Sequence, residues 1–287
     1  MLHAGASSAT PTFSHRVLKS AAAAVDRVRR PVPGIVVLIY HRVGGRSGLA
    51  VDLDSGAFDD QMAWLAASGR VVTFERALDL LASNAAASGD GDPAAPDNPI
   101  VVTFDDGTAD FADIAVPILD RHQVPALMYL ATDFIERGDA FPDDGAPMSW
   151  NAVRDCRSTG LVDFGSHTHT HALLDRLRPD EIDAELDRSM ELIAEHLGVP
   201  ARDFAYPKAL APSAAADVAV RRRFRSAVLA GTRANRIGAT DPFRIARSPI
   251  QTYDGFAYFV RKAEGGMAFE DSARNLVNRV RYAGATS

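Results

Sequence analysis

Short apolar runs alternate with amphipathic segments along most of the chain. The apolar runs have the length of strands that are buried on both faces. They lie at residues 34–41, 70–74, 100–104, 125–131, 162–167, 203–207, 224–230 and 242–250. Apolar positions recur at helical spacing at residues 55–68, 75–83, 111–122, 147–159 and 179–198. The last segment is the clearest helix, because it opens with Pro179, carries acidic residues early and ends before Gly198.

This alternation predicts a parallel sheet covered by helices. Six or more strand–helix units in one run favour closure into a barrel over two separate domains. We therefore expect an α/β fold, a distorted (β/α) barrel with about seven parallel strands. Residues 84–99 are rich in Ala, Gly, Asp and Pro and are expected to form a surface loop. In such barrels the chemistry collects at the C-terminal ends of the strands.

The composition of the chain limits the kinds of partner and site that it could have. The 287 residues are 47% hydrophobic, which is enough to bury a substantial core. The net charge of −6 argues against nucleic acid as the main partner. The single cysteine, Cys156, excludes an intramolecular disulfide and a cysteine-based zinc site, and we expect it to be buried as a small hydrophobe.

The first 33 residues are expected to be a basic amphipathic helix or a tail, with a single domain at 34–287. The apolar positions at helical spacing are Phe13, Val17, Ala21, Ala24 and Val28. A basic amphipathic helix can lie on an anionic membrane surface, or it can pack on its own domain. No apolar run approaches the roughly 20 residues of a membrane span, and the start lacks the apolar core of a signal peptide. We therefore expect a cytoplasmic protein, with peripheral contact at the inner face of the membrane left open.

A pair of aspartates ends the apolar run at 100–104. On a regular strand, Asp105 and Asp106 would point to opposite faces, so only one would reach a site. Gly107 relaxes this limit, because it permits a sharp turn directly after the pair. A phosphatase of the haloacid-dehalogenase type is excluded, because it needs Asp-x-Asp and the residue two beyond Asp105 is Gly107. A turn-capping role stays open beside a functional one.

Three histidines lie at the end of the apolar run at 162–167 and directly after it. Neutral imidazole is the commonest side-chain metal ligand, and His167, His169 and His171 lie within five residues. On a straight strand all three would share one face. If the chain turns after Gly165, His167 and His171 meet on one side and His169 points away.

Together these motifs resemble the polysaccharide deacetylases of carbohydrate esterase family 4, the NodB-homology type. The family's first motif, Thr-Phe-Asp-Asp-Gly, stands here at residues 103–107, and its second, His-(Ser/Thr)-x-x-His, stands at 167–171. The similarity extends over roughly residues 35 to 250. Both motifs, in order and about sixty residues apart, are more specific than either one alone.

The resemblance implies roles for these residues. Asp106, His167 and His171 would be the metal ligands and Asp105 the catalytic base, whereas His169 falls at a variable position. One divalent ion is implied, with zinc as the default and cobalt or nickel also accepted by such a ligand set. A bound zinc ion would make an activated water available at neutral pH.

The chain departs from the family at its general acid. The family's acid is a histidine in a C-terminal Leu-x-His motif, whereas the last histidine here is His196. His41, at the end of the first apolar strand, is the candidate substitute. The alternative for His41 is a histidine that orients the first loop.

The third motif departs as well. The family's Arg-x-Pro-Tyr is here Ala-Tyr-Pro-Lys at 205–208, so the oxyanion-binding backbone N–H would belong to Lys208. The arginine that normally braces the base would be supplied by Arg247, with Arg244 as the alternative. Lys208 would favour an anionic substrate or simply be solvated. Trp150 is expected to pack on the barrel rather than stack on sugar.

The implied function is metal-dependent hydrolysis of N-acetyl groups. The substrate would be an N-acetylated amino sugar of a polysaccharide or of a lipid-linked glycan precursor. Two alternatives stay open, an amidohydrolase of a small cyclic amide or ureide and a degenerate glycan-binding protein on the same scaffold.

Overall fold

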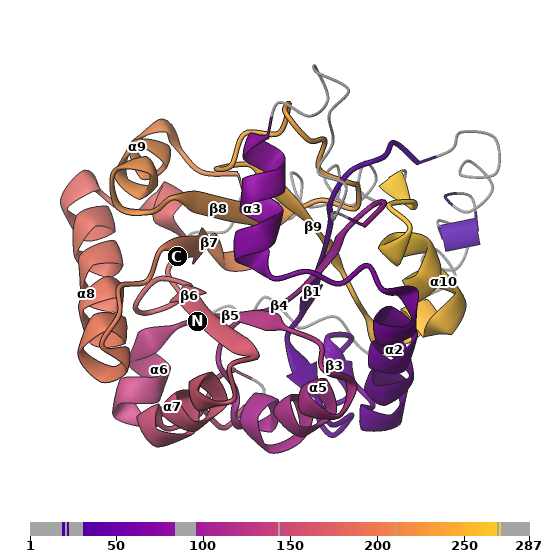
Figure 1. The fold of residues 1–287 in the computed structure, drawn as a ribbon. Helices are drawn as coiled ribbons and strands as arrows, with labels where there is room; N and C mark the ends of the chain where they lie inside the picture. The colour runs from indigo at the N-terminus through magenta and orange to yellow at the C-terminus, as the bar shows by residue number, and fades with distance from the viewer. Residues whose placement is uncertain are drawn as a thin grey trace.

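In a computed structural model of the chain, a closed barrel of parallel strands is surrounded by helices (Figure 1). The structure describes residues 19, 20, 22, 31–83, 96–142, 144–209, 211–268 and 270. The barrel strands in these ranges, in spatial order, are β1 (Val36–Tyr40), β4 (Ile100–Phe104), β5 (Ala126–Leu130), β6 (Val162–Ser166), β7 (Asp203–Ala205), β8 (Ser226–Ala230) and β9 (Ile245–Pro249). β9 pairs with β1 and closes the ring. This confirms the expected α/β barrel.

Most of the helices connect successive strands and cover the outside of the barrel (Figure 1). Their described bounds are α2 (Ser55–Ser68), α3 (Phe74–Ala82), α5 (Val116–His122), α6 (Thr132–Arg137), α7 (Trp150–Ser158), α8 (Pro179–Leu197), α9 (Ala214–Arg223) and α10 (Gly255–Ala263). Shorter helical turns are η1 (Phe111–Ala115), η2 (Leu174–Arg176), η3 (Pro207–Ala209) and η4 (Thr252–Asp254). Two short strands, β2 (Arg42–Val43) and β3 (Asp52–Leu53), pair beside the barrel.

Side chains of the barrel strands alternate between two apolar cores. On β1, for example, Val36, Leu38 and Tyr40 pack outward in the core shared with α2, whereas Val37 packs inside the barrel. Inside, the strand residues meet the apolar face of α3, formed by Phe74, Ala77, Leu80 and Leu81. Helix α3 therefore closes the end of the barrel where the strands begin, and it lies across the strands in Figure 1. A functional site would therefore be expected at the opposite end of the barrel, where the strands end.

The strand predicted at 70–74 is wrong. Only Val71 pairs with a strand residue there, in an isolated parallel bridge to Ile100. The Thr73 side chain accepts a hydrogen bond from the backbone N–H of Arg76 and so caps α3, which begins at Phe74. A good N-cap ends the extended segment before it can form a ladder.

The sequence pattern missed α6, α9 and α10. The first is a single short helix of six residues, and α9 buries only small residues, Ala216 and Ala219, beside Val220. Such helices show little of the wide apolar stripe on which periodicity depends. Tertiary contacts with the barrel compensate for this weak local signal.

Most of the predicted N-terminal helix lies outside the described residues, as does most of the predicted loop at 84–99. Lys19 and Ala22 are described, and both are buried. The Lys19 ammonium donates hydrogen bonds to the carboxylates of Asp254 and Glu270. Lys19 thus contacts η4 and the segment that follows α10. Of the described helices, none combines the length and the apolar character needed to cross a membrane.

Candidate active site

The ends of four strands bring the candidate residues into one pocket of about 190 Å³. The pocket is lined by His41, Asp105, Asp106, His167, His171 and Lys208, together with Ile39, Ala230, Pro249 and Gln251. The first six residues follow β1, β4, β6 and β7 in sequence. They converge because the C-terminal ends of parallel barrel strands meet at one face.

Both aspartates reach this pocket because the turn begins inside the pair. Asp105 continues the inward alternation of β4, where Val101 and Thr103 also face the barrel interior. Asp106 then adopts a left-handed backbone with φ of 77°, followed by Gly107 at 100°. A Cβ on Gly107 would lie 3.0 Å from a methyl group of Leu130, so glycine is needed for space as well. The strand pleat alone would have sent the two carboxylates apart.

Asp106, His167 and His171 form a group able to hold a metal ion. Their ligand atoms all lie within 4.8 Å of one another. The His171 Nε2 lies 3.5 Å and the His167 Nε2 lies 3.7 Å from Asp106 Oδ1. The His167 Nδ1 lies 2.8 Å from the backbone carbonyl of Ala205, which can only accept, so Nδ1 carries the proton. That bond leaves the lone pair of Nε2 directed at the site, as in metal-binding histidines.

The charge state of this group also suits a cation. Burial lowers the pKa of His171 to about 4, although the nearby Asp106 carboxylate opposes the shift. Burial acts to raise the pKa of Asp106, but the nearby histidines, His171 first, outweigh it and hold that pKa below its ordinary value. At neutral pH the site therefore offers a carboxylate and a neutral imidazole. Two nitrogen donors and one oxygen donor fit a divalent ion of the zinc type.

Asp105 is held by a buried arginine rather than by the metal-binding group. The Arg247 guanidinium donates two hydrogen bonds to the Asp105 carboxylate, at 2.6 and 2.8 Å, and a third at 3.2 Å to the Thr103 hydroxyl. Arg247 is 0% and Asp105 2% exposed. Burial acts to raise the pKa of Asp105, but the charge and hydrogen bonds of Arg247, together with the nearby histidines, outweigh it and the pKa falls to about 2. The alternative brace, Arg244, instead donates to Asp217 at 2.7 Å.

His41 and Lys208 complete the lining. Burial lowers the pKa of the His41 imidazole, and within the described chain its buried Nδ1 has no hydrogen-bond partner. Lys208 is exposed and adopts a left-handed backbone with φ of 55° and ψ of 8°. The third histidine of the motif, His169, turns away from the pocket, and its Nδ1 lies 3.0 Å from the Thr132 hydroxyl. Trp150 is buried in the outer core and does not line the pocket.

The family model for polysaccharide deacetylase matches residues 92–226. This range contains both motifs, with the aspartate pair and the histidines that converge in the pocket. Over this range the chain matches the polysaccharide deacetylase family. No curated protein sequence matches it.

Solved structures of similar fold cover about four fifths of the chain. IcaB from Ammonifex degensii is 25% identical with a TM-score of 0.68, and the match covers 82% of this chain and 99% of that one. The Streptococcus pyogenes deacetylase PplD, solved in complex with acetate, is 21% identical with a TM-score of 0.67, covering 81% and 99%. A de-N-acetylase from Aggregatibacter actinomycetemcomitans is 20% identical with a TM-score of 0.64, covering 79% and 99%.

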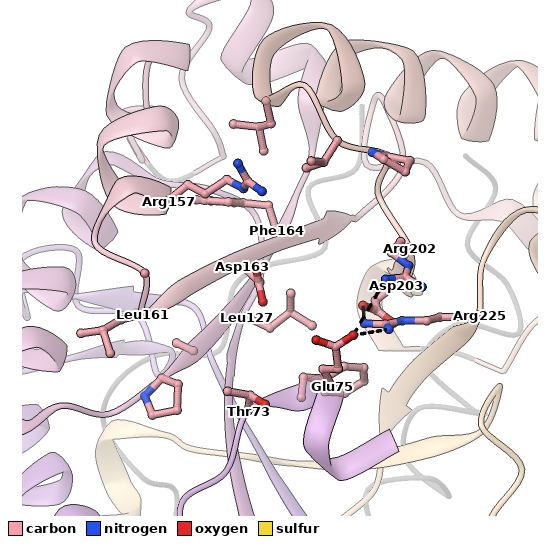
Figure 2. Close-up of a pocket in the computed structure, with 17 residues that line it drawn as sticks. Thr73, Glu75, Leu127, Arg157, Leu161, Asp163, Phe164, Arg202, Asp203 and Arg225 are labelled. Atoms are coloured by element: carbon pink, nitrogen blue, oxygen red, sulfur yellow. Dashed lines mark hydrogen bonds and ion pairs between the residues drawn. The ribbon is translucent and has the colours of Figure 1, made fainter. Parts of the chain in front are cut away.

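A larger pocket, of about 550 Å³ (Figure 2), has its lining at the opposite end of the barrel. It is lined by residues near the starts of β5 to β8 and of α3. Its acids and bases pair with one another, since Arg225 donates to Asp203 at 2.9 and 3.0 Å and to Glu75 at 3.2 Å. Within the described ranges, the group able to hold a metal lies in the smaller pocket and not here. The smaller pocket is therefore the candidate active site.

Several contacts of the candidate site carried no sequence signal. The Ala205 carbonyl that orients His167 belongs to the backbone, so its side chain could not reveal it. Gln251 lines the pocket from a segment after β9 that no motif singled out. Glu185 on α8 contacts the histidine loop from a segment that reads only as an amphipathic helix. Such partners become visible only when the strands are placed side by side.

Proposed function

We propose that this protein is a metal-dependent hydrolase that removes N-acetyl groups from N-acetylated amino sugars. The substrate would be a polysaccharide or a lipid-linked glycan precursor. The observation that carries the proposal is the metal-binding group of Asp106, His167 and His171 beside the buried Asp105–Arg247 pair in one pocket. An acid–base group next to a cation site is what hydrolysis of an amide requires.

Each of the pocket residues would have a distinct role in this reaction. A divalent ion, when bound, would supply an activated water and Lewis acidity toward the acetamide carbonyl. Asp105, ionised and held rigidly by Arg247, would accept the proton of the attacking water. The backbone N–H of Lys208 would donate to the oxygen that becomes negative during attack. His41 would protonate the departing amine, which is otherwise a poor leaving group.

A second candidate is hydrolysis of a small cyclic amide or ureide. The pocket volume of about 190 Å³ is small compared with the roughly 300–1,000 Å³ of common ligand sites. That volume suits a compact amide, and it also suits an acetamido group whose sugar lies partly outside. Both reactions would use the same residues, so they differ in substrate and not in site.

Acetate release from N-acetylglucosamine oligomers by zinc-loaded protein tests the proposal. We expect activity in the wild type, loss of at least about 100-fold in Asp105→Asn, and near wild-type activity in His169→Ala, whose side chain faces away from the pocket. The His169 variant is the matched control, because it removes a histidine from the same motif. Absence of acetate release from any N-acetylated sugar with zinc, cobalt or nickel would contradict the proposal, and turnover of cyclic amides would favour the second candidate.

The role of His41 has a separate test in the pH profile. Burial lowers the pKa of His41 from its ordinary 6.5, so an acid role predicts that kcat/KM declines as pH rises above a value below 6.5. His41→Ala should lose both activity and this descending limb. If His41→Ala keeps the descending limb of the kcat/KM profile unchanged, the limb belongs to another group and His41 has a structural role.

A further inference from the structure

The loop that carries the two metal-binding histidines has an unfavourable backbone. Thr168 and His171 both adopt left-handed conformations, with φ of 66° and 62°. Residues other than glycine rarely occupy this region, and they persist there only when surrounding contacts hold them. The orientation of His171 toward Asp106 therefore depends on what holds residues 168–171.

Glu185 of helix α8 supplies the densest set of contacts to this loop. One oxygen of its carboxylate accepts hydrogen bonds from the backbone N–H groups of His169, at 3.0 Å, and Thr170, at 2.8 Å. The other oxygen accepts from the Thr170 hydroxyl at 2.7 Å. Hydrogen bonds to an ionised acceptor are stronger than neutral ones. A single side chain thus satisfies three donors between the two metal-binding histidines.

A second contact of α8 holds the start of the same loop. Ser189, one helical turn after Glu185, is fully buried, and its hydroxyl lies 2.8 Å from that of Ser166 at the end of β6. The Ser166 hydroxyl in turn accepts from the Thr168 N–H at 3.3 Å. Residues four apart on a helix share a face, so α8 contacts the loop at two successive positions.

The other side of the loop is held by α6. The Asp133 N–H donates to the His169 carbonyl at 2.8 Å, and the His169 ring contacts Thr132. The His169 backbone is therefore bound from both sides, by α6 and by Glu185. This arrangement turns the His169 ring away from the pocket and leaves the His171 ring 3.5 Å from Asp106.

We infer that Glu185 is a positioning residue for the metal centre. It does not line the pocket, and it acts by holding the backbone between His167 and His171 in the conformation that brings both rings to Asp106. The inference rests on the metal site of the proposed function, but not on the identity of the substrate. Partners that orient metal ligands from outside the coordination shell typically change metal affinity about 10- to 100-fold when removed.

Zinc affinity, measured by competition with a chromophoric chelator on the full chain, tests this inference without any substrate. We expect Glu185→Ala to weaken zinc binding about 10- to 100-fold. Glu185→Gln should stay within about threefold of the wild type, because its amide oxygen can accept both N–H groups and its amide nitrogen can donate to the Thr170 hydroxyl. Thr170→Ala, which loses only the hydroxyl contact, should give a smaller loss than Glu185→Ala.

Glu191→Ala is the matched control, because Glu191 lies on the exposed face of the same helix and its side chain is 65% exposed. Its zinc affinity should equal that of the wild type. The inference would be overturned if Glu185→Ala kept wild-type zinc affinity or if the Ala and Gln variants lost affinity equally. It would also be overturned if the wild type bound no zinc. If Glu185→Ala does not fold, the Gln and Thr170 variants still decide between the outcomes. A wild type that binds zinc in this pattern but releases no acetate would leave the inference standing and contradict only the proposed reaction.

Discussion

The ion pair of Asp105 and Arg247 sets the charge at the base of the pocket. Both side chains are buried, and the guanidinium forms two parallel hydrogen bonds with the carboxylate. The ring of Tyr129 lies 5.2 Å from the guanidinium carbon, a distance at which a cation is attracted to an aromatic ring. Such a pair keeps the carboxylate ionised and fixed in direction, which a proton acceptor requires.

Because of this ion pair, the free energy of unfolding depends on pH in the acid range. The pKa of Asp105 is about 2 in the folded metal-free protein, against an ordinary 3.8. The ionised carboxylate therefore contributes fully to the free energy of unfolding above about pH 4, and this contribution is lost as the pH falls through 2. The contribution at neutral pH is on the order of 2 kcal/mol. We expect the free energy of unfolding of Asp105→Asn to fall less steeply between pH 4 and pH 2 than that of the wild type. Urea unfolding of metal-free protein measures this, and equal slopes would contradict the assignment.

Burial should protect the Cys156 thiol from reaction in the folded protein. It is 4% exposed on α7, and burial raises the pKa of its thiol to about 11. Because the thiolate is the reactive form, the folded protein should react very slowly with a disulfide reagent at pH 8. Unfolding in urea should expose the thiol and restore the rate of an ordinary cysteine. Fast reaction of the folded protein would show that this side chain is accessible.

At the scale of elements, α3 divides the barrel into a closed end and an open end. Its residues Phe74, Ala77, Leu80 and Leu81 pack against inward-facing residues of the strands. The Phe74 ring meets the edge of Tyr129, with centroids 6.4 Å apart. The helix thus fills the interior from the start of the strands, so the polar residues gather at the other end, where the pocket lies.

Truncation of the α3 contact should destabilise the whole barrel. Phe74 is 6% exposed, and we expect Phe74→Ala to lower the free energy of unfolding by about 3–5 kcal/mol through lost burial and the cavity left behind. Phe256→Ala on α10 is the control, since Phe256 is 48% exposed and should cost far less. Chemical denaturation compares the two variants. Similar losses in both would show that α3 does not seal the interior.

At the scale of the whole molecule, a buried charge cluster links distant parts of the chain to the pocket wall. Asp254 binds the ammonium groups of Lys19 and Lys262 and accepts the Gln251 N–H at 2.7 Å. Lys262 also donates to the Pro249 carbonyl at 2.8 Å. Pro249 and Gln251 both line the pocket. The cluster therefore supports one side of the site from behind.

Loss of one charge from this cluster should be costly. Lys262 is 0% exposed, and Lys262→Met leaves the buried Asp254 with less compensation, which we expect to cost about 3–5 kcal/mol of unfolding free energy. Arg261→Met, the neighbouring position on α10, should change stability by no more than about 0.5 kcal/mol. Thermal and urea unfolding measure both. A Lys262 variant as stable as the Arg261 variant would show that the cluster is not needed for folding.

The sequence by itself determined the features that depend on neighbouring residues. Continuous apolar runs of strand length indicated strands buried on both faces, and their alternation with helices predicted the parallel barrel. The motifs at 103–107 and 167–171 indicated the resemblance to the polysaccharide deacetylases, because short spacings are fixed along the chain. The same local reading failed at 70–74, where a capping threonine started α3, and it missed helices such as α9 that bury only small side chains.

The tertiary structure decided which of these residues meet. Arg244 and Arg247 are three residues apart and look alike in sequence, but only the inward alternation of β9 brings Arg247 to Asp105, 142 positions away. The left-handed backbone at Asp106 turns both aspartates into one pocket, against the alternation of an ordinary strand. Helices α6 and α8 direct His169 outward and His171 inward. Closure of the ring brings together residues that no spacing along the chain relates, because contacts across a barrel depend on strand order and not on sequence distance.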